Sequence, residues 1–209
     1  INIMINIIYA VGLNLILGVA GQFSLGHAGF IAIGSYSGAI LGKMMNGLPG
    51  LFAGMAVGVV ISVIVAFLVG LPTLRLKGDY LAIATLGVAE IIRVAVTNMK
   101  ITNGAAGISG VPLTNTWTIT YIALVVTTIL ILNYTFSSAG RATYAVLQDE
   151  IAAESMGVQV TKYKILAFVL GAATASIGGT LSATTLGAVT PSDFTFMKSI
   201  EVLIIVVFG

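Results

Sequence analysis

Few side chains in this sequence of 209 residues could do acid–base, nucleophilic or metal chemistry. There is one histidine, His27, there is no cysteine, and there are seven acidic residues. No second histidine and no carboxylate lies near His27 in the sequence, so a metal site or a general base there would lack partners. The sequence therefore predicts no catalytic residue and no metal site, and it argues against an enzyme.

We expect His27 to be a packing histidine that makes a hydrogen bond. A second interpretation comes from its neighbours, because Gln22, Ser24 and His27 lie among glycines and Asn14 precedes them by a short distance. Irregular backbone at membrane depth is tolerated where it faces a cavity. These four residues are therefore candidates for lining a transport pathway, and Glu90 joins them as the one carboxylate placed for it.

Glu90 and Arg93 lie three residues apart in a long apolar segment, 79–98. Side chains at this spacing are neighbours on a helix surface. Either charge alone at the centre of a membrane would cost about 2.5 to 3.5 kcal/mol. We therefore expect a structural ion pair between Glu90 and Arg93, and a role in gating or in the pathway is the alternative.

A polar segment, 137–164, carries six of the sixteen charged side chains and is called the polar island below. No charged residue occurs in 101–140 or in 165–192, so the island separates two apolar stretches. Ser137 and Ser138 can cap a short helix that runs from Arg141 to Leu147. A second short helix is expected over 149–156, with Gly157 suited to the left-handed position that ends it.

The second short helix has two different faces. Glu150 and Glu154 are four residues apart and repel each other by a few tenths of a kcal/mol, roughly. The opposite face is small and apolar, with Ile151, Ala152, Ser155 and Met156. This pattern favours a helix that lies in the groove of a partner protein, and a solvated loop helix is the alternative.

The elements that position these residues are apolar segments. Hydrophobic residues make up 58% of the chain and charged residues 8%, whereas soluble domains have about 45–50% and about 25%. The apolar runs lack the alternation of barrel strands, so helices of about 20 residues are expected to cross the bilayer. The sequence predicts an all-α, polytopic transmembrane helical bundle. Its seven expected segments are 2–20, 25–42, 50–70, 79–98, 117–136, 163–187 and 198 onward.

The chain begins at Ile1 without Met and stops at Gly209 inside an apolar run. We expect one transmembrane domain over 1–209, cut at both ends, and we expect 2–20 to be a span and not a signal peptide. A cytoplasmic polar island would place Arg75, Lys77, Arg141, Lys162 and Lys164 inside and Lys43, Lys100 and Lys198 outside, as the positive-inside rule prefers. The net charge of +2 and the scattered basic residues argue against a nucleic-acid partner.

Small residues recur at four-residue spacing in three segments and predict close helix packing within one subunit. A subunit interface is the alternative. The series are Gly34, Gly38 and Gly42, then Gly54 and Gly58, then Gly171, Ala175 and Gly179.

Four stretches of the sequence resemble one protein family. They are GRATYAVLQDEIAAESMGVQVTKYK at 140–164, GLNLILGVAGQFSLGHAGFIAIGSY at 12–36, LRLKGDYLAIATLGVAEIIR at 74–93 and SIEVLIIVVFG at 199–209. Together they resemble the permease subunits of branched-chain amino acid importers of the ATP-binding-cassette (ABC) class, the LivM type. The resemblance implies a multi-pass protein of the bacterial or archaeal inner membrane, that is, the plasma membrane. It makes the polar island a cytoplasmic coupling loop of short helices.

The resemblance also implies partners: ABC ATPase subunits, a second permease subunit, an extracytoplasmic substrate-binding protein and the lipid bilayer. The positions of this chain that match the ATPase-coupling loop are Arg141, Asp149, Glu150, Ala153, Glu154 and Gly157. Leu147 and Gln148 depart from the pattern, where a basic and then an acidic residue are expected. No GxxxxGK[ST] sequence occurs, so this chain is expected to bind no cofactor, and ATP and Mg²⁺ are expected in the ATPase subunits.

The IAAESMG form of the loop resembles amino-acid importers more than urea or sugar permeases of the same class, which remain an alternative. An ion-coupled secondary transporter is the alternative from another class. Such a protein would need a charged group at the midplane, for which Glu90 is the available carboxylate, and it would leave the polar island unexplained.

Overall fold

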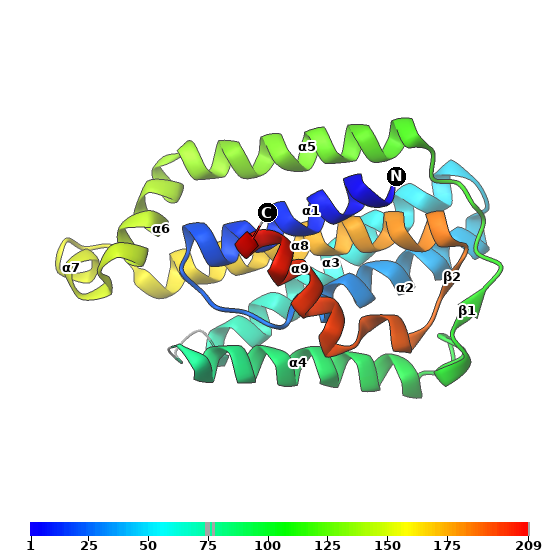
Figure 1. Ribbon diagram of the computed structural model, residues 1–209, viewed down its shortest axis with the longest axis horizontal. Helices are drawn as coiled ribbons and strands as arrows, with labels where there is room; N and C mark the ends of the chain where they lie inside the picture. Colours follow the sequence, from blue (N-terminus) through cyan, green and yellow to red (C-terminus); the bar gives the residue numbers. More distant parts are fainter. Residues whose placement is uncertain (74–75, 77, 209) are drawn as a thin grey trace.

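The computed structural model describes residues 1–73, 76 and 78–208, and almost all of them are helical or in short connections (Figure 1). Arg75 and Lys77, which the orientation prediction places inside, lie outside the described residues. The helices are α1 (Asn2–Asn14), α2 (His27–Met45), α3 (Leu48–Thr73), α4 (Asp79–Asn98), α5 (Trp117–Phe136), α6 (Ser138–Gln148), α7 (Glu150–Ser155), α8 (Val160–Leu186) and α9 (Phe196–Phe208). The short elements are a π-helical turn (Leu15–Val19), two 3₁₀ turns (Gly104–Ala106 and Pro191–Phe194) and strands β1 (Ile108–Ser109) and β2 (Ala188–Val189).

All seven predicted segments are helical, which confirms an all-α polytopic bundle. Five helical stretches within the described ranges have the length and hydropathy of a membrane span: Asn2–Val19, Leu48–Thr73, Asp79–Asn98, Trp117–Phe136 and Val160–Leu186. α2 differs because fourteen of its nineteen residues are buried by other helices. A helix enclosed by protein has little lipid-facing surface and needs no continuous apolar run.

Close backbone contacts join α2, α3 and α8 at the centre of the bundle. A methyl group added at Gly34 would overlap the Ser176 main chain of α8, and one added at Gly54 would lie 2.7 Å from the Gly38 Cα. One added at Gly58 would lie 3.2 Å from the Gly34 Cα. The small residues therefore pack helices within this chain, which confirms the first interpretation of their spacing.

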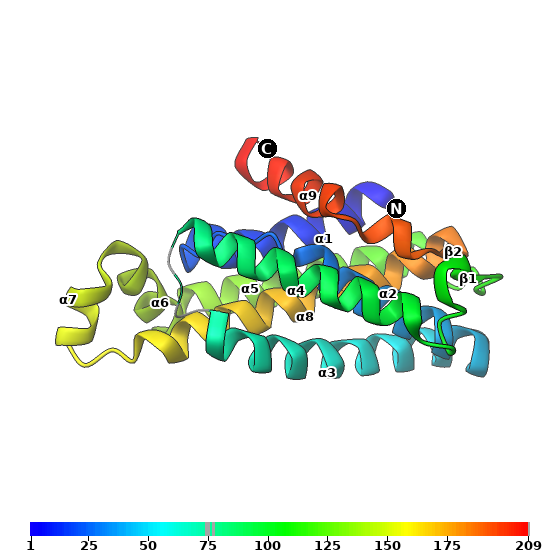
Figure 2. The same ribbon diagram turned by 90° about the horizontal axis from the view of Figure 1, so that it is seen from below.

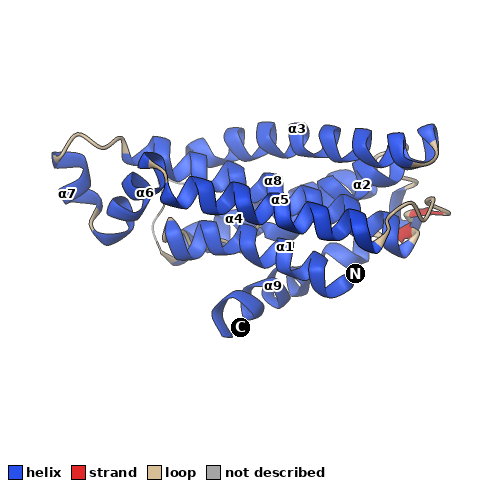
Figure 3. Cartoon of the chain, turned by 90° about the horizontal axis from the view of Figure 1, so that it is seen from above, coloured by secondary structure: helices blue, strands red, loops and turns tan. Residues whose placement is uncertain are grey.

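The two ends of the bundle differ in structure. α6 and α7 project at one end, where α3 also ends and α4 begins (Figures 1 and 2). At the opposite end β1 pairs with β2 in antiparallel register, Ile108 opposite Val189, and Figure 3 shows both strands there. The predicted loop 100–116 is thus tied down at this end, where Val111 N also donates to the Gly187 carbonyl over 2.9 Å.

The first span ends in an irregular segment. After α1 the helix widens into the π-turn Leu15–Val19, and Gly21 adopts a positive φ of 66°. The chain then runs without helical structure over 21–26, back along the bundle from the end that carries α6, before α2 begins (Figure 1). The predicted break in the helix is therefore present, and it is partly buried: Gln22, Ser24 and Gly26 are buried, whereas Gly21 and Phe23 are exposed.

Candidate functional site

The polar island folds into two short helices because each has a side-chain cap. The Ser137 hydroxyl accepts a hydrogen bond from Gly140 N at 3.2 Å and begins α6. Asp149 Oδ1 accepts from Ile151 N at 2.9 Å and from Ala152 N at 3.0 Å, which begins α7. α7 ends before Gly157, whose φ of 83° is the predicted left-handed conformation. The expected helix over 149–156 is shorter than predicted, because Asp149 serves as its cap.

Contacts to α5, to α8 and to the segment after α1 join α6 and α7 to the membrane helices. The Tyr134 hydroxyl of α5 and the Thr143 hydroxyl of α6 are hydrogen-bonded at 2.7 Å. Lys164, in the first turns of α8, forms an ion pair with Glu150 of α7. Leu147 of α6 lies against Gly21, where a methyl group would overlap its Cδ1 atom. A displacement of α6 and α7 would therefore act on three membrane segments at once.

The six positions predicted to couple to an ATPase all lie on this projecting end. Four of them are exposed: Arg141, Asp149, Glu154 and Gly157. Glu150 is half-buried beside Lys164, and Ala153 is buried within the chain. The apolar face of α7 is uncovered in this chain, with Ile151 76% and Met156 84% exposed. Apolar side chains at a projecting tip are typical of a surface that a partner covers.

The irregular segment 21–26 touches α4, α6 and α8, and the first turn of α2 that follows it touches α9. Gln22 Nε2 donates to the Lys164 carbonyl of α8 at 3.0 Å. Leu25 N donates to Thr85 Oγ1 of α4 at 3.0 Å, and just beyond the segment Ala28 N donates to Ser199 Oγ of α9 at 3.1 Å. With the Leu147 contact from α6, this segment and the first turn of α2 are the point at which the island, α4, α8 and α9 meet. Sequence reasoning did not find this junction, because its contacts are distant in the chain.

The polar residues proposed for a pathway do not all lie together. Gln22, Ser24 and His27 are buried around the irregular segment, whereas Asn14 is exposed beside Gly18. His27 is 1% exposed, as expected of a packing histidine. The predicted hydrogen bond is absent among the described residues: the Tyr9 main chain lies beside the ring, but neither ring nitrogen makes a well-formed bond. A role in the pathway stays a prediction.

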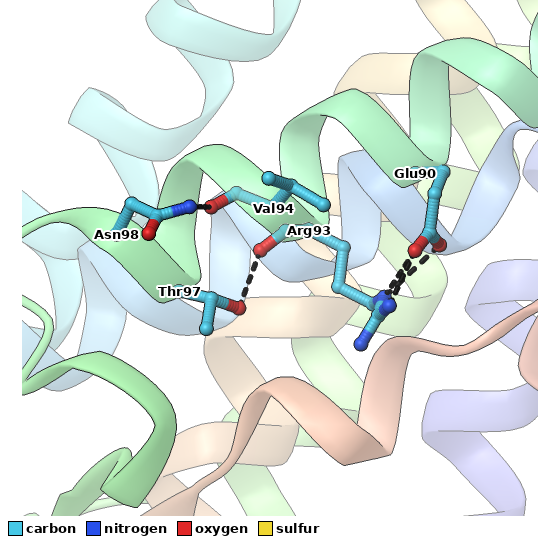
Figure 4. Close-up of polar contacts among 5 residues, drawn as sticks. All are labelled: Glu90, Arg93, Val94, Thr97 and Asn98. Atoms are coloured by element: carbon cyan, nitrogen blue, oxygen red, sulfur yellow. Dashed lines mark hydrogen bonds and ion pairs between the residues drawn. The ribbon is translucent and has the colours of Figure 1, made fainter.

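Glu90 and Arg93 form the predicted ion pair on α4 (Figure 4). Arg93 Nε donates to both carboxylate oxygens, at 3.1 and 3.0 Å, and Nη2 also contacts Oε1. The Glu90 side chain is 49% exposed and the Arg93 side chain is 31% exposed, so the pair faces outward from this chain. In a bilayer an outward pair at this depth needs protein or water beside it, because lipid solvates charges poorly.

A second polar group, which the sequence analysis did not single out, lies at the strand end of the bundle. Lys198 Nζ contacts Glu201 Oε2 at 2.9 Å on α9. Tyr9 of α1 and Ser182 of α8 lie with them around a cavity of about 330 Å³. The i,i+3 spacing of Lys198 and Glu201 is the one feature of the sequence that could have predicted their ion pair. The hydroxyls come from segments far apart in the sequence, which hid the cluster.

No group of three or more histidine, cysteine, aspartate or glutamate side chains that could hold a metal ion occurs in the described part of the chain. The arrangement offers ion pairs, caps and contact surfaces. These are suited to transmitting motion and to binding.

The sequence matches the family described as "Branched-chain amino acid transport system / permease component" over residues 1–209. It is 37% identical to the high-affinity branched-chain amino acid transport system permease protein LivM of Salmonella typhimurium and 36% identical to that of Escherichia coli. Each alignment covers 99% of this chain and 56% of the relative. A probable branched-chain amino acid transport permease protein LivM of Methanocaldococcus jannaschii is 27% identical over 92% of this chain and 60% of its own length.

The chain thus spans about half the length of the curated relatives it matches. No solved structure matches it. The family match covers every segment described above, from α1 to α9, and the five apolar helices agree with a multi-pass protein of the plasma membrane. The chain belongs to the branched-chain amino acid transport system permease family.

Proposed function

We propose that this chain is a permease subunit of an ABC importer, and that it forms part of the pathway for branched-chain or other hydrophobic amino acids. Its ATP and Mg²⁺ would be bound by separate ATPase subunits. A second permease subunit and an extracytoplasmic substrate-binding protein would complete the assembly. The family and the names of three relatives support the substrate class.

The observation that carries the proposal is the junction between the polar island and the irregular segment 21–26. α7 presents an exposed apolar face and an exposed Glu154 at its tip, which suit a partner's groove. Behind that tip, Leu147 contacts Gly21, and Lys164 joins Glu150 through its side chain and Gln22 through its carbonyl. Closure of an ATPase around α7 would then shift the irregular segment.

Irregular backbone suits this role because it bends at lower cost than a continuous helix. The segment 21–26 contacts α4 through Thr85, and Ala28, two residues beyond it, contacts α9 through Ser199. Its displacement would therefore move the helices that carry Glu90 and Lys198. Packed elements that can adopt two discrete arrangements can carry motion between distant sites in this way.

The exposed Glu90–Arg93 pair indicates that the α4 face lies against another protein or a water-filled pathway in the assembled importer, because lipid solvates charges poorly. A carboxylate that binds a coupling ion would have to exchange partners freely, but Glu90 already accepts three contacts from Arg93. The pair therefore favours the ATP-driven importer over an ion-coupled secondary transporter.

The test is co-purification of the whole permease with candidate ATPase subunits, followed by ATP hydrolysis and uptake of L-leucine in proteoliposomes. We expect stable binding to the ATPases and hydrolysis that rises when loaded substrate-binding protein is added. Leucine uptake that proceeds without ATP and follows an ion gradient would contradict the proposal.

A further inference from the structure

Two adjoining cavities open at the strand end of the bundle, opposite the polar island. Their volumes are about 330 and about 240 Å³. Both are lined by Tyr9, Ser182, Leu186, Lys198 and Glu201, so the Lys198–Glu201 ion pair lies between them. α9 carries the pair, and its C-terminal end stands away from the rest of the bundle (Figure 2). The larger cavity lies at the lower end of the size range of small-molecule sites.

The larger cavity has charged groups of both signs. Lys198 supplies an ammonium, and Glu201 and Asp193 supply carboxylates. Asp193 is held in place because its Oδ2 accepts from Thr190 N at 2.9 Å and from Thr190 Oγ1 at 2.8 Å. Lys198 Nζ lies 2.9 Å from Glu201 Oε2, and both side chains are partly exposed. Such a pair can open to receive another ion pair at small net cost.

Hydroxyl groups and apolar side chains complete the wall. Tyr9 is almost fully buried and its hydroxyl faces Ser182. Ser35 also lines the cavity, with its hydroxyl donating to the Gly179 carbonyl at 3.0 Å. The rest of the surface is aliphatic or aromatic and comes from Ile31, Ala183, Leu186, Ala188, Val189 and Phe194. The cavity therefore joins a zwitterionic region to an apolar one. These are the two chemical features of an aliphatic α-amino acid.

We propose that this cavity binds an aliphatic α-amino acid in its zwitterionic form. The carboxylate of the amino acid pairs with Lys198, its ammonium pairs with Glu201 and Asp193, and its side chain lies against Ile31, Val189 and Phe194. The inference rests on the proposed function, since it assigns to the permease itself a binding site for the transported molecule at the face opposite the ATPases.

The position of the site also connects it to the coupling end. Lys198 and Glu201 share α9 with Ser199, which accepts the hydrogen bond from Ala28 N directly after the irregular segment. A shift of that segment would move α9 against Tyr9 and Ser182, the residues of α1 and α8 that line both cavities. The site would then change shape when the island moves.

The test is binding of L-leucine to the purified permease–ATPase complex, without the substrate-binding protein, measured as a leucine-dependent rise in melting temperature. Isocaproate lacks the ammonium and isoamylamine lacks the carboxylate, and we expect neither to reproduce the rise. Lys198→Met and Glu201→Gln are each expected to raise the half-saturating leucine concentration about tenfold or more, since each removes one charged hydrogen-bond partner.

Ala188→Trp gives an independent variant, because Ala188 lines the cavity from an exposed position of strand β2 and contributes no charge. We expect it to fill the cavity and abolish the leucine effect while the complex elutes and melts as the parent does. Lys100→Met, at an exposed lysine of the same end, is the matched control and should leave leucine binding unchanged.

Leucine binding that survives all three cavity variants would overturn the site. That result would leave the proposed function standing if ATP-driven leucine uptake persists in the parent complex. Absence of ATP-driven uptake in the parent would instead refute the proposed function. Binding of isocaproate or isoamylamine as tight as that of leucine would overturn the zwitterion assignment.

Discussion

The centre of the bundle and the polar island are held together in opposite ways. In the centre, α2, α3 and α8 meet main chain against main chain, and glycines leave no room for a methyl group at Gly34, Gly54 or Gly58. In the island, α6 and α7 are held by caps, by the Glu150–Lys164 ion pair and by side-chain hydrogen bonds of Thr143 and Arg141 to α5. The first arrangement resists displacement, and the second permits it.

This difference assigns a mechanical role to each region. Close-packed interiors are bistable or rigid, and small shifts there are costly. Few contacts and exposed surface mark the regions that move at low cost. We infer that the three central helices form the frame, and that the island moves against it through the segment 21–26.

The strongest test of the rigid centre is Gly34→Leu. The added side chain would overlap the Ser176 main chain of α8, which cannot rotate away as a side chain can. We expect a loss of stability of about 3 kcal/mol or more, or no folded protein at all. Detergent melting and size-exclusion chromatography would measure it.

Gly87→Ala is the control at a glycine with open space around it, because a methyl group at Gly87 of α4 has nothing within 4 Å. Alanine is favoured over glycine inside helices by about 1 kcal/mol, so this variant should be neutral or more stable. Equal behaviour of the two variants would contradict the rigid centre.

The island is tested by Glu154→Lys, which reverses an exposed charge on α7. We expect ATP-driven uptake to fall about tenfold or more, because a like charge would meet the partner groups that Glu154 attracts. Membrane insertion and melting should stay unchanged. Lys100→Glu at the opposite end serves as the control for charge reversal, and parental uptake by Glu154→Lys would refute the docking role.

The connection between the two regions is tested by a double-mutant cycle on Glu150→Gln and Lys164→Met. We expect a coupling energy of about 0.5 to 1 kcal/mol in melting experiments, because the pair is partly buried. Hydrolysis in the assembled complex should also become less dependent on loaded substrate-binding protein. Additive effects of the two substitutions on both readouts would show that Glu150 and Lys164 are not coupled, and would contradict a connection between α7 and α8 through this pair.

The smallest effect is expected at the exposed Glu90–Arg93 pair. Glu90→Ala should destabilise the protein more than Glu90→Ala combined with Arg93→Ala, since the single change leaves one charge unpaired. We expect a difference of about 0.3 to 0.5 kcal/mol for this half-exposed i,i+3 pair. Equal losses in detergent melting would show that the pair contributes nothing.

The membrane helices could be predicted because hydropathy is a local property of the chain. Segment 117–136 matches α5 residue for residue, and the predicted 79–98 matches α4. The predicted 50–70 and 163–187 differ by one to three residues at their ends from Leu48–Thr73 and Val160–Leu186. Turn and cap residues limit such predictions, because several neighbouring residues can each begin a helix.

The functional regions were less accessible from the sequence. The i,i+3 pair Glu90–Arg93 follows from helix geometry alone, and the structure contains it. The Leu147–Gly21 contact, the β1–β2 pairing and the meeting of Tyr9 with Ser182 at the cavity each depend on residues more than 75 positions apart in the chain. No local pattern encodes such distances. Whether a ring nitrogen of His27 makes a well-formed hydrogen bond likewise depends on which groups its neighbours present, and among the described residues the Tyr9 main chain lies beside the ring.

The most direct measurement uses the absence of cysteine from these 209 residues. A single Ile151→Cys at the exposed tip of α7 provides a label site, and Leu113→Cys, exposed near β1, provides one at the opposite end. We expect a membrane-impermeant maleimide to label Ile151→Cys from the cytoplasmic side only, and bound ATPase subunits to block that labelling. Labelling of Ile151→Cys from the outer side, or labelling that the ATPases leave unchanged, would contradict the account.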